Sequence, residues 1–254
     1  MIDGHVHIER GPYRIEWIKE FVDIAVKRGI KTLHLLELSH RFFEFNELYS
    51  EVTKYNDYQK DWYKKKSGNS IEDYKTLIMQ AREYEWPIEL KFGLEVCYIE
   101  GKEKVIEEIR NSFNWDYITG SVHWIDGWGF DHKPEFWEGQ NVDAQYKRYY
   151  NIMMNLVKSN LFNILAHPDS IKCFGHYYSG DLDSAYKELA QLIKYSGMQV
   201  EQSAGLFLNY KHKEMGMNKQ LLNMMKEYGV DIITASDAHS PEDVGQFIQE
   251  MQHI

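Results

Sequence analysis

Seven short apolar segments alternate with amphipathic stretches along the chain, and this alternation limits the possible folds more than any other feature. The apolar segments are rich in β-branched and aromatic residues, as buried strands are, and they span residues 2–8, 31–37, 90–98, 116–124, 162–168, 198–203 and 230–237. Apolar residues recur at helical spacing in the stretches 15–29, 71–85, 102–112, 142–159, 183–197, 217–228 and 241–251. Strands that alternate with helices pair in parallel, and nearly continuous apolar strands are covered on both faces. We therefore predict an α/β fold whose parallel sheet closes into a barrel.

The chain is long enough to bury one large core, and we predict a single domain over residues 1–254. Its 254 residues are 43% hydrophobic, and no Pro-, Gly- or Ser-rich linker divides them. Residues 38–70 interrupt the alternation with many aromatic and charged residues and no clean strand. We expect this segment to form an extended loop and a helix over one end of the barrel, or a lid that contacts a substrate.

The net charge and the cysteine content exclude several classes of protein. A formal charge of -10 disfavours a surface that binds nucleic acid, although it allows a local pocket for one phosphate. The only cysteines, Cys97 and Cys173, are too few for a disulfide scaffold and suit a reducing cytoplasm. We see no signal peptide and no apolar stretch of membrane-spanning length. We predict a cytoplasmic protein without a nucleic-acid or membrane partner, and the sequence does not indicate its oligomeric state.

Histidines and carboxylates gather at the carboxyl ends of the predicted strands. His5 and His7 end the first strand, where residues i and i+2 project on the same side. Later strand ends carry Glu95, His123, His167, Asp237 and His239. Because parallel α/β proteins place their sites at these ends, we expect the seven side chains to meet and to form a metal centre. Among the other histidines, His176 is the one that we expect to come near.

The donor set favours particular metals and a particular reaction. Imidazole and carboxylate without thiolate suit Zn, Mn or Fe, and seven donors exceed what one tetrahedral ion needs. A carboxylate such as Glu95 can bridge two ions, and ions about 3.5–4 Å apart clamp the oxygens of an in-line phosphoryl displacement. The sequence therefore indicates a phosphoesterase with two or three divalent ions, which generate hydroxide from water near neutral pH. The implied partner is a small phosphate monoester.

Five motifs in a fixed order, DGHVH, GLEV, SVHW, AHPD and ASDAH, resemble the polymerase and histidinol phosphatase (PHP) superfamily, and most closely its histidinol-phosphatase branch. The resemblance runs from residue 2 to about residue 240. It implies a distorted, TIM-like (β/α)7 barrel with a centre of two or three metal ions. It also implies hydrolysis of L-histidinol phosphate to L-histidinol and phosphate in histidine biosynthesis.

The resemblance also implies which residues of this chain bind which ion. The first ion would be held by His5, His7, Glu95 and Asp237. The second ion would be held by Glu95, as a bridge, together with His123 and His167. His239 matches a ligand of the third ion in members that bind three.

The chain departs from the family pattern around this third ion. Leu38 stands where the second motif usually has a histidine after its acid, which is Glu37 here. A loop histidine that commonly follows the first motif is not evident either. His40, or Glu9, is our candidate for a substitute ligand.

For the reaction itself, we expect Asp237 or His239 to protonate the leaving alkoxide. The candidate phosphate-binding cations are Arg41, Arg10 and Lys172. Acidic and aromatic residues in 41–63, such as Trp62, are candidates for the cationic end of the substrate. Three alternatives stay open: another phosphate monoester, a metal-binding family member with little or no turnover, and a carbon–nitrogen hydrolase of the amidohydrolase type.

Overall fold

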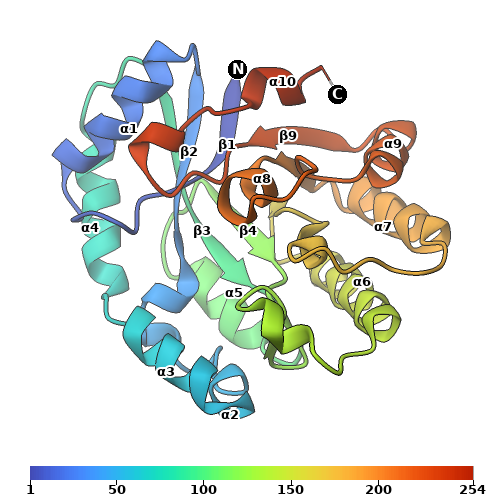
Figure 1. Ribbon diagram of the computed structural model, residues 1–254. Helices are drawn as coiled ribbons and strands as arrows, with labels where there is room; N and C mark the ends of the chain where they lie inside the picture. Colours follow the sequence, from blue (N-terminus) through green and yellow to red (C-terminus); the bar gives the residue numbers. More distant parts are fainter. Residues whose placement is uncertain (254) are drawn as a thin grey trace.

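Seven parallel strands form one sheet whose two edge strands meet in a nearly closed barrel (Figure 1). The computed structural model describes residues 1–253. In sheet order the strands are β1 (Ile2–His7), β2 (Thr32–Leu38), β3 (Glu89–Cys97), β4 (Tyr117–Ser121), β7 (Ile164–Leu165), β8 (Gln199–Ser203) and β9 (Asp231–Ala235). The carboxyl ends of β1 and β9 come together through a bridge between Val6 and Ala238. The predicted barrel is therefore confirmed.

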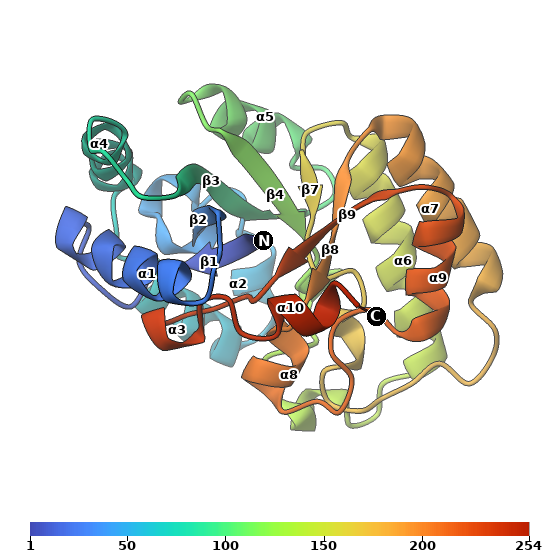
Figure 2. The ribbon, with the colours of Figure 1, turned by 90° about the horizontal axis from the view of Figure 1, so that it is seen from above.

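Helices surround this barrel, as the view from above shows (Figure 2). Those that connect or follow the strands are α1 (Ile15–Lys27), α4 (Ile71–Arg82), α5 (Glu103–Asn111), α6 (Val142–Lys158), α7 (Asp183–Ser196), α8 (Gly205–Tyr210), α9 (Lys219–Glu227) and α10 (Ile248–Met251). Their apolar faces pack inward because apolar residues recur every three or four positions; in α1 the buried residues are Ile18, Phe21, Val22 and Ala25. No helix within residues 1–253 has both the length and the apolar character needed to span a membrane.

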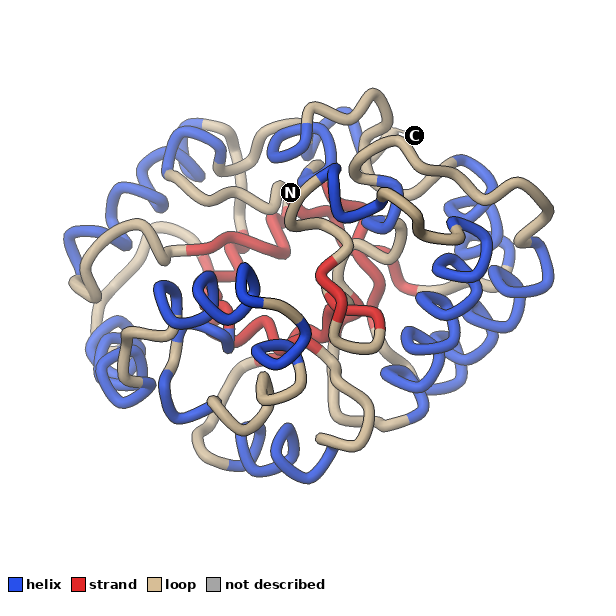
Figure 3. Tube along the Cα trace, turned by 60° about the horizontal axis from the view of Figure 1, so that its bottom comes forward, coloured by secondary structure: helices blue, strands red, loops and turns tan. Residues whose placement is uncertain are grey.

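Residues 38–70 form an ordered cover over the carboxyl end of the barrel. They contain α2 (Val52–Tyr55) and α3 (Asp57–Lys66), and Figure 3 shows helices in front of the ring of strands. Leu48, Tyr49 and Val52 are fully buried, so the segment is packed onto the body of the protein. Next to it lies a short antiparallel hairpin, β5 (Trp124–Ile125) and β6 (Trp128–Gly129).

Two predicted elements are shorter in the structure than the sequence pattern indicates. The strand predicted at 162–168 pairs only over Ile164–Leu165, because the chain leaves the sheet just before His167, whose φ is 24°. The helix predicted at 241–251 is a 3-10 turn at Pro241–Asp243 followed by α10. Gly245 lies between them at φ 73°, a left-handed conformation that a continuous α-helix does not contain.

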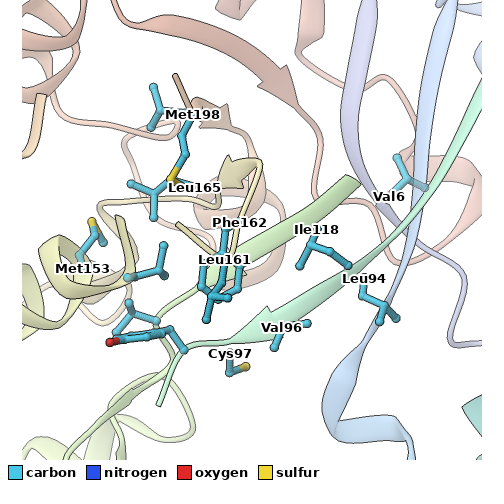
Figure 4. Close-up of a cluster of buried hydrophobic side chains, with 14 of the residues drawn as sticks. Val6, Leu94, Val96, Cys97, Ile118, Met153, Leu161, Phe162, Leu165 and Met198 are labelled. Carbon is cyan, nitrogen blue, oxygen red and sulfur yellow. The ribbon is translucent and has the colours of Figure 1, made fainter. Parts of the chain in front are cut away.

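The hydrophobic core fills the space between the sheet and its helices. Figure 4 shows part of it, a cluster of buried side chains that includes Val96 of β3, Ile118 of β4, Leu165 of β7 and Met153 of α6. These residues are at most 2% exposed. The sheet is thus covered on its outer face.

His34 is a buried histidine of β2 that gives a stability prediction. Its side chain is 4% exposed and packs 4.7 Å from the ring of Tyr117. Burial, with a smaller contribution from the charge of Lys91, lowers the pKa of His34 to about 3. A histidine with a lowered pKa is neutral in the folded state, so the unfolded chain takes up its proton first as the pH falls below about 6.5. The stabilisation is complete above pH 6.5 and is lost progressively towards pH 3.

Between pH 7 and pH 5 we therefore expect the free energy of unfolding of the wild type to fall by about 2 kcal/mol more than that of His34→Gln. Urea unfolding of both proteins in a chelating buffer measures this difference, because other titrating groups are shared and cancel. Parallel pH dependences of the two proteins would show that the pKa of His34 is not lowered in the folded state.

Candidate metal centre

Closure of the barrel brings the two ends of the chain into one cluster of metal-ligating side chains. His5 and His7 project from the carboxyl end of β1, and the backbone N–H of Asp237 donates to the His5 carbonyl at 3.0 Å. The Asp237 carboxylate therefore lies beside both imidazoles. Glu95, from the carboxyl end of β3, reaches the same point and is 1% exposed.

Five donor–donor distances in this first group are close to the edge length of a tetrahedron around a metal ion. His5 Nε2 lies 2.9 Å from His7 Nε2, 3.2 Å from Glu95 Oε2 and 3.7 Å from Asp237 Oδ1. His7 Nε2 lies 3.4 Å from Glu95 Oε2 and 3.2 Å from Asp237 Oδ1. Ligands about 2.0–2.1 Å from a tetrahedral ion are separated from one another by about 3.3 Å. His5, His7 and Asp237 therefore converge as the ligands of one ion do, and Glu95 Oε2 lies within 3.4 Å of both imidazoles.

A second group uses the other oxygen of the same glutamate. Glu95 Oε1 lies 2.9 Å from His123 Nε2 and 3.5 Å from His167 Nε2. His123 follows β4 and His167 follows β7, so neighbouring strands supply them. Glu95 thus presents one oxygen to each group, which is the arrangement of a carboxylate that bridges two ions.

Hydrogen bonds from the other ring nitrogens fix the orientation of two of these histidines. His5 Nδ1 lies 2.8 Å from Glu201 Oε1, and His123 Nδ1 lies 2.6 Å from Asp131 Oδ2. A carboxylate behind a ligating histidine holds its ring and raises its basicity. Neither carboxylate was predicted from the residue patterns. A glutamate inside the apolar segment 198–203 was a signal for Glu201, whereas Asp131 lies in a loop that carries no pattern.

Glu201→Gln is expected to weaken zinc binding about tenfold, because it removes the charge that supports His5 while keeping the side-chain volume. Competition with a chromophoric chelator measures the dissociation constant. Glu188→Gln, at an exposed ion pair with Lys158, is the matched control and should bind zinc as the wild type does. Equal affinity of the two variants would argue against a role for Glu201 in the centre.

The third candidate group consists of His7, Glu9 and His239. Glu9 Oε1 lies 2.9 Å from His239 Nδ1, and the rings of His7 and His239 stack 4.3 Å apart. His7 also belongs to the first group, so Glu9 and His239 are the two donors that belong to this group alone. Leu38 lines the cavity above the centre, where it offers no donor. His40 lines the same cavity and lies outside all three groups.

Burial and the surrounding charges shift the pKa values of the carboxylates in opposite directions. Burial alone would raise the pKa of Glu95, but hydrogen bonds with His123, His167 and His5 hold it well below its usual range. The pKa of Asp237 is likewise shifted downward by His7 and its neighbours against the effect of burial. Burial next to Glu9 instead raises the pKa of Glu37 to about 8. The carboxylates of the centre are therefore ionised, as metal ligands must be.

A cavity of about 270 Å³ opens onto the three groups. Its lining combines ligands of the centre with side chains from the 38–70 cover, the hairpin and α8: His7, Leu38, His40, Tyr58, Trp62, Glu95, His123, Trp124, Asp131, His132, His167, Ser170, Gly205, Leu206, Asn209, Tyr210, Asp237 and His239. Over the described residues, this lining includes neither lysine nor arginine.

The three candidate phosphate-binding cations lie elsewhere. Lys172 is 2% exposed, and its Nζ is bound by Asp169 at 2.6 Å and Glu214 at 2.8 Å. Arg41 donates to the backbone carbonyl of Glu9 at 3.2 Å. Arg10 is largely exposed beside the carboxylate of Glu9. The structure therefore does not bring these three side chains to the cavity.

Two further histidines differ from expectation. His132 lines the cavity, with its ring 4.6 Å from that of Trp62. His176 instead stacks on Trp137 at 4.5 Å and does not line the cavity. The loop between β6 and α6 brings His132 inward, a path that residue spacing does not reveal.

With this geometry in place, similarity to known proteins identifies the family. Residues 3–204 match the PHP domain. The chain belongs to the PHP domain family. The family predicted from the five ordered motifs is thereby confirmed.

Two relatives of this chain share the name probable histidinol-phosphatase. A protein of Deinococcus radiodurans named a probable histidinol-phosphatase is 32% identical over 176 residues, which cover 65% of this chain and 63% of that protein. A protein of Schizosaccharomyces pombe with the same name is 24% identical over 171 residues, which cover 62% of this chain and 56% of that protein. The matched region is thus shorter than two thirds of either relative.

Two solved structures share the fold of this PHP protein over nearly its whole length. A histidinol phosphatase homologue of Listeria monocytogenes superimposes with a TM-score of 0.80 at 18% identity, covering 98% of this chain and 99% of that chain. The histidinol phosphate phosphatase of Lactococcus lactis, solved with zinc, L-histidinol and phosphate, gives a TM-score of 0.71 at 18% identity, covering 98% and 93% of the chains. These likenesses establish the barrel fold.

Proposed function

We propose that this PHP protein is a metal-dependent phosphatase that hydrolyses L-histidinol phosphate to L-histidinol and phosphate. The observation that carries the proposal is the placement of Glu95, whose two carboxylate oxygens face two separate donor groups. Paired ions at such a carboxylate suit in-line phosphoryl displacement. The choice of substrate is supported by the name shared by the relatives and by the ligands of the Lactococcus lactis structure.

Different residues of the chain would bind the metal ions and donate the proton in this reaction. His5, His7, Asp237 and Glu95 would hold one ion, and Glu95, His123 and His167 would hold another. Bound ions lower the pKa of water and neutralise the phosphoryl oxygens. Glu9 holds His239 through Nδ1 and leaves Nε2 directed towards Asp237 Oδ1, at 3.7 Å. His239 is thus placed to supply a proton to the leaving alkoxide. Zinc is our first choice of metal, with manganese or iron as alternatives, and the number of ions is two or three.

The aromatic side of the cavity suits the imidazole of the proposed substrate. Trp62 of α3 lies 4.6 Å from the ring of His132 and 4.8 Å from that of His40. Tyr58, one turn before Trp62, also lines the cavity. Flat rings in this arrangement can stack on a planar group that is bound through its phosphate at the centre.

Trp62→Ala is therefore expected to raise KM for L-histidinol phosphate roughly fivefold, because a stacked aromatic contact contributes about 1 kcal/mol. The KM for glycerol phosphate, which has no ring, should change little. Steady-state kinetics on both substrates measure the effect. Tyr195→Ala, at an exposed position of α7, serves as the control. An unchanged KM for histidinol phosphate would place the imidazole elsewhere.

We further propose that residues 1–254 form one catalytic domain. Asp237 and His239 lie beyond the matched range 3–204, yet they complete two of the donor groups. The cytoplasmic location remains a prediction, supported by two cysteines that are both free and buried.

A substrate panel tests the proposed function. Zinc- and manganese-reconstituted protein is assayed for phosphate release from L-histidinol phosphate, p-nitrophenyl phosphate, glycerol phosphate and a phosphotyrosine peptide. We expect kcat/KM to be highest for L-histidinol phosphate by at least about 100-fold, which corresponds to about 2.7 kcal/mol of transition-state discrimination. A higher kcat/KM for another monoester would support a phosphatase with a different substrate.

A further inference from the structure

Gly205 is the first residue of α8, and its backbone conformation does not require a glycine. Its φ lies outside the left-handed region, and the residue is buried. Alanine adopts this conformation readily and favours a helix more than glycine does. The reason for glycine at this position therefore lies in its surroundings.

The surroundings consist of the carboxylate of Asp237. A Cβ atom on residue 205 would lie 2.0 Å from Asp237 Oδ2 and 2.8 Å from both Cβ and Cγ of Asp237. Contacts this short do not occur between unbonded atoms, so any larger residue at 205 must displace the aspartate. Asp237, a residue of the first donor group, thus fills the space that a side chain on residue 205 would occupy.

Asn209, one helical turn after Gly205, contacts the same carboxylate. Its Nδ2 donates to Asp237 Oδ2 at 3.1 Å and lies 3.3 Å from the Asp237 carbonyl oxygen. The opposite oxygen, Oδ1, faces His7 Nε2 at 3.2 Å. The carboxylate therefore has one oxygen held by α8 and the other directed into the donor group.

Asp237 also has a backbone conformation that its surroundings must maintain. Its φ is 55°, in the left-handed region that non-glycine residues rarely adopt, and its N–H is held by the His5 carbonyl. Strain of this kind persists where neighbouring contacts determine the geometry. The β1 end holds the backbone of Asp237, and α8 holds its side chain.

We propose that α8 is a positioning element for the metal centre: Gly205 provides the space and Asn209 the hydrogen bond that make Asp237 present Oδ1 alone to the ion. Both are positioning residues, since they act through Asp237. The inference rests on the proposed function only in taking the first group to hold a metal ion.

The first test is zinc affinity, measured without substrate by competition with a chromophoric chelator. Gly205→Ala is expected to raise the dissociation constant for zinc at the first donor group at least tenfold, and Asn209→Ala to raise it by a smaller factor. Gly68→Ala is the control, because a Cβ there meets nothing within 4 Å. Wild-type affinity in Gly205→Ala would overturn the proposal. Because no substrate is involved, a failure to hydrolyse histidinol phosphate leaves this result interpretable.

The second test separates positioning from general damage to the fold. In metal-free protein, Gly205→Ala should lower the melting temperature when Asp237 is present. In the Asp237→Gly background the same change should have little effect, since the carboxylate and the left-handed strain are both gone. An equal loss in the two backgrounds would mean that Gly205 is needed by the packing of α8 itself, and the proposal would be wrong.

Discussion

Glu95→Gln is expected to lower kcat/KM for phosphate-monoester hydrolysis on the order of 10³-fold, because a single carboxylate contributes an oxygen to both donor groups. The amide keeps the volume of the side chain but loses the charge that balances two ions. The fold should survive, since β3 is held by seven aligned residue pairs with β2. Steady-state phosphate release and the metal content of the purified variant check the expectation together.

The matched control for this change lies on the same strand. Glu89 is at the amino end of β3, where it is exposed and accepts a hydrogen bond from Thr32. Glu89→Gln should retain wild-type activity and wild-type metal content. If Glu95→Gln kept more than about a tenth of the activity with both ions bound, the bridging role of Glu95 would have to be abandoned.

Removal of the metal ions is expected to abolish binding of inorganic phosphate as well as turnover. Over the described residues, the cavity is lined by neither lysine nor arginine, and Lys172 is held by two carboxylates outside it. His123 and His239, whose pKa values are raised, are each paired with a carboxylate, Asp131 and Glu9, and so offer an anion little net charge in the metal-free protein. We therefore expect the ions to supply most of the charge attraction for phosphate.

Titration calorimetry with inorganic phosphate measures this effect before and after chelation. We expect the dissociation constant to rise at least 100-fold in metal-free protein and to recover when zinc is added back, a change of about 2.7 kcal/mol. Retained binding in the metal-free protein would show that a cation such as Arg41 swings into the cavity.

The fold and the first two donor groups were predictable from the sequence because both depend on periodic features. A parallel strand carries its polar residues to the same edge of the sheet as its neighbours, so strand order alone places His5, His7, Glu95, His123 and His167 together. Closure of the barrel then brings Asp237 beside His5. These inferences require only strand order and the alternation of side chains.

Other parts of the site depend on loop paths, which residue spacing does not encode. His132 enters the cavity from the loop after β6, while His176, which looked better placed, stacks on Trp137. Lys172 was a candidate phosphate-binding cation, but its ammonium group is bound by Asp169 and Glu214. The missing side chain of Gly205 is informative only once Asp237 is seen beside it.

The most direct test of the proposed function is the rate of phosphate release from L-histidinol phosphate by the zinc- or manganese-reconstituted wild type, compared with the chelated protein and with Glu95→Gln. We predict saturable turnover by the reconstituted wild type and at least about a 10³-fold lower kcat/KM in the other two samples. Absence of turnover from the wild type with metals bound would contradict the proposed function and would favour a metal-binding PHP protein that does not act on this substrate.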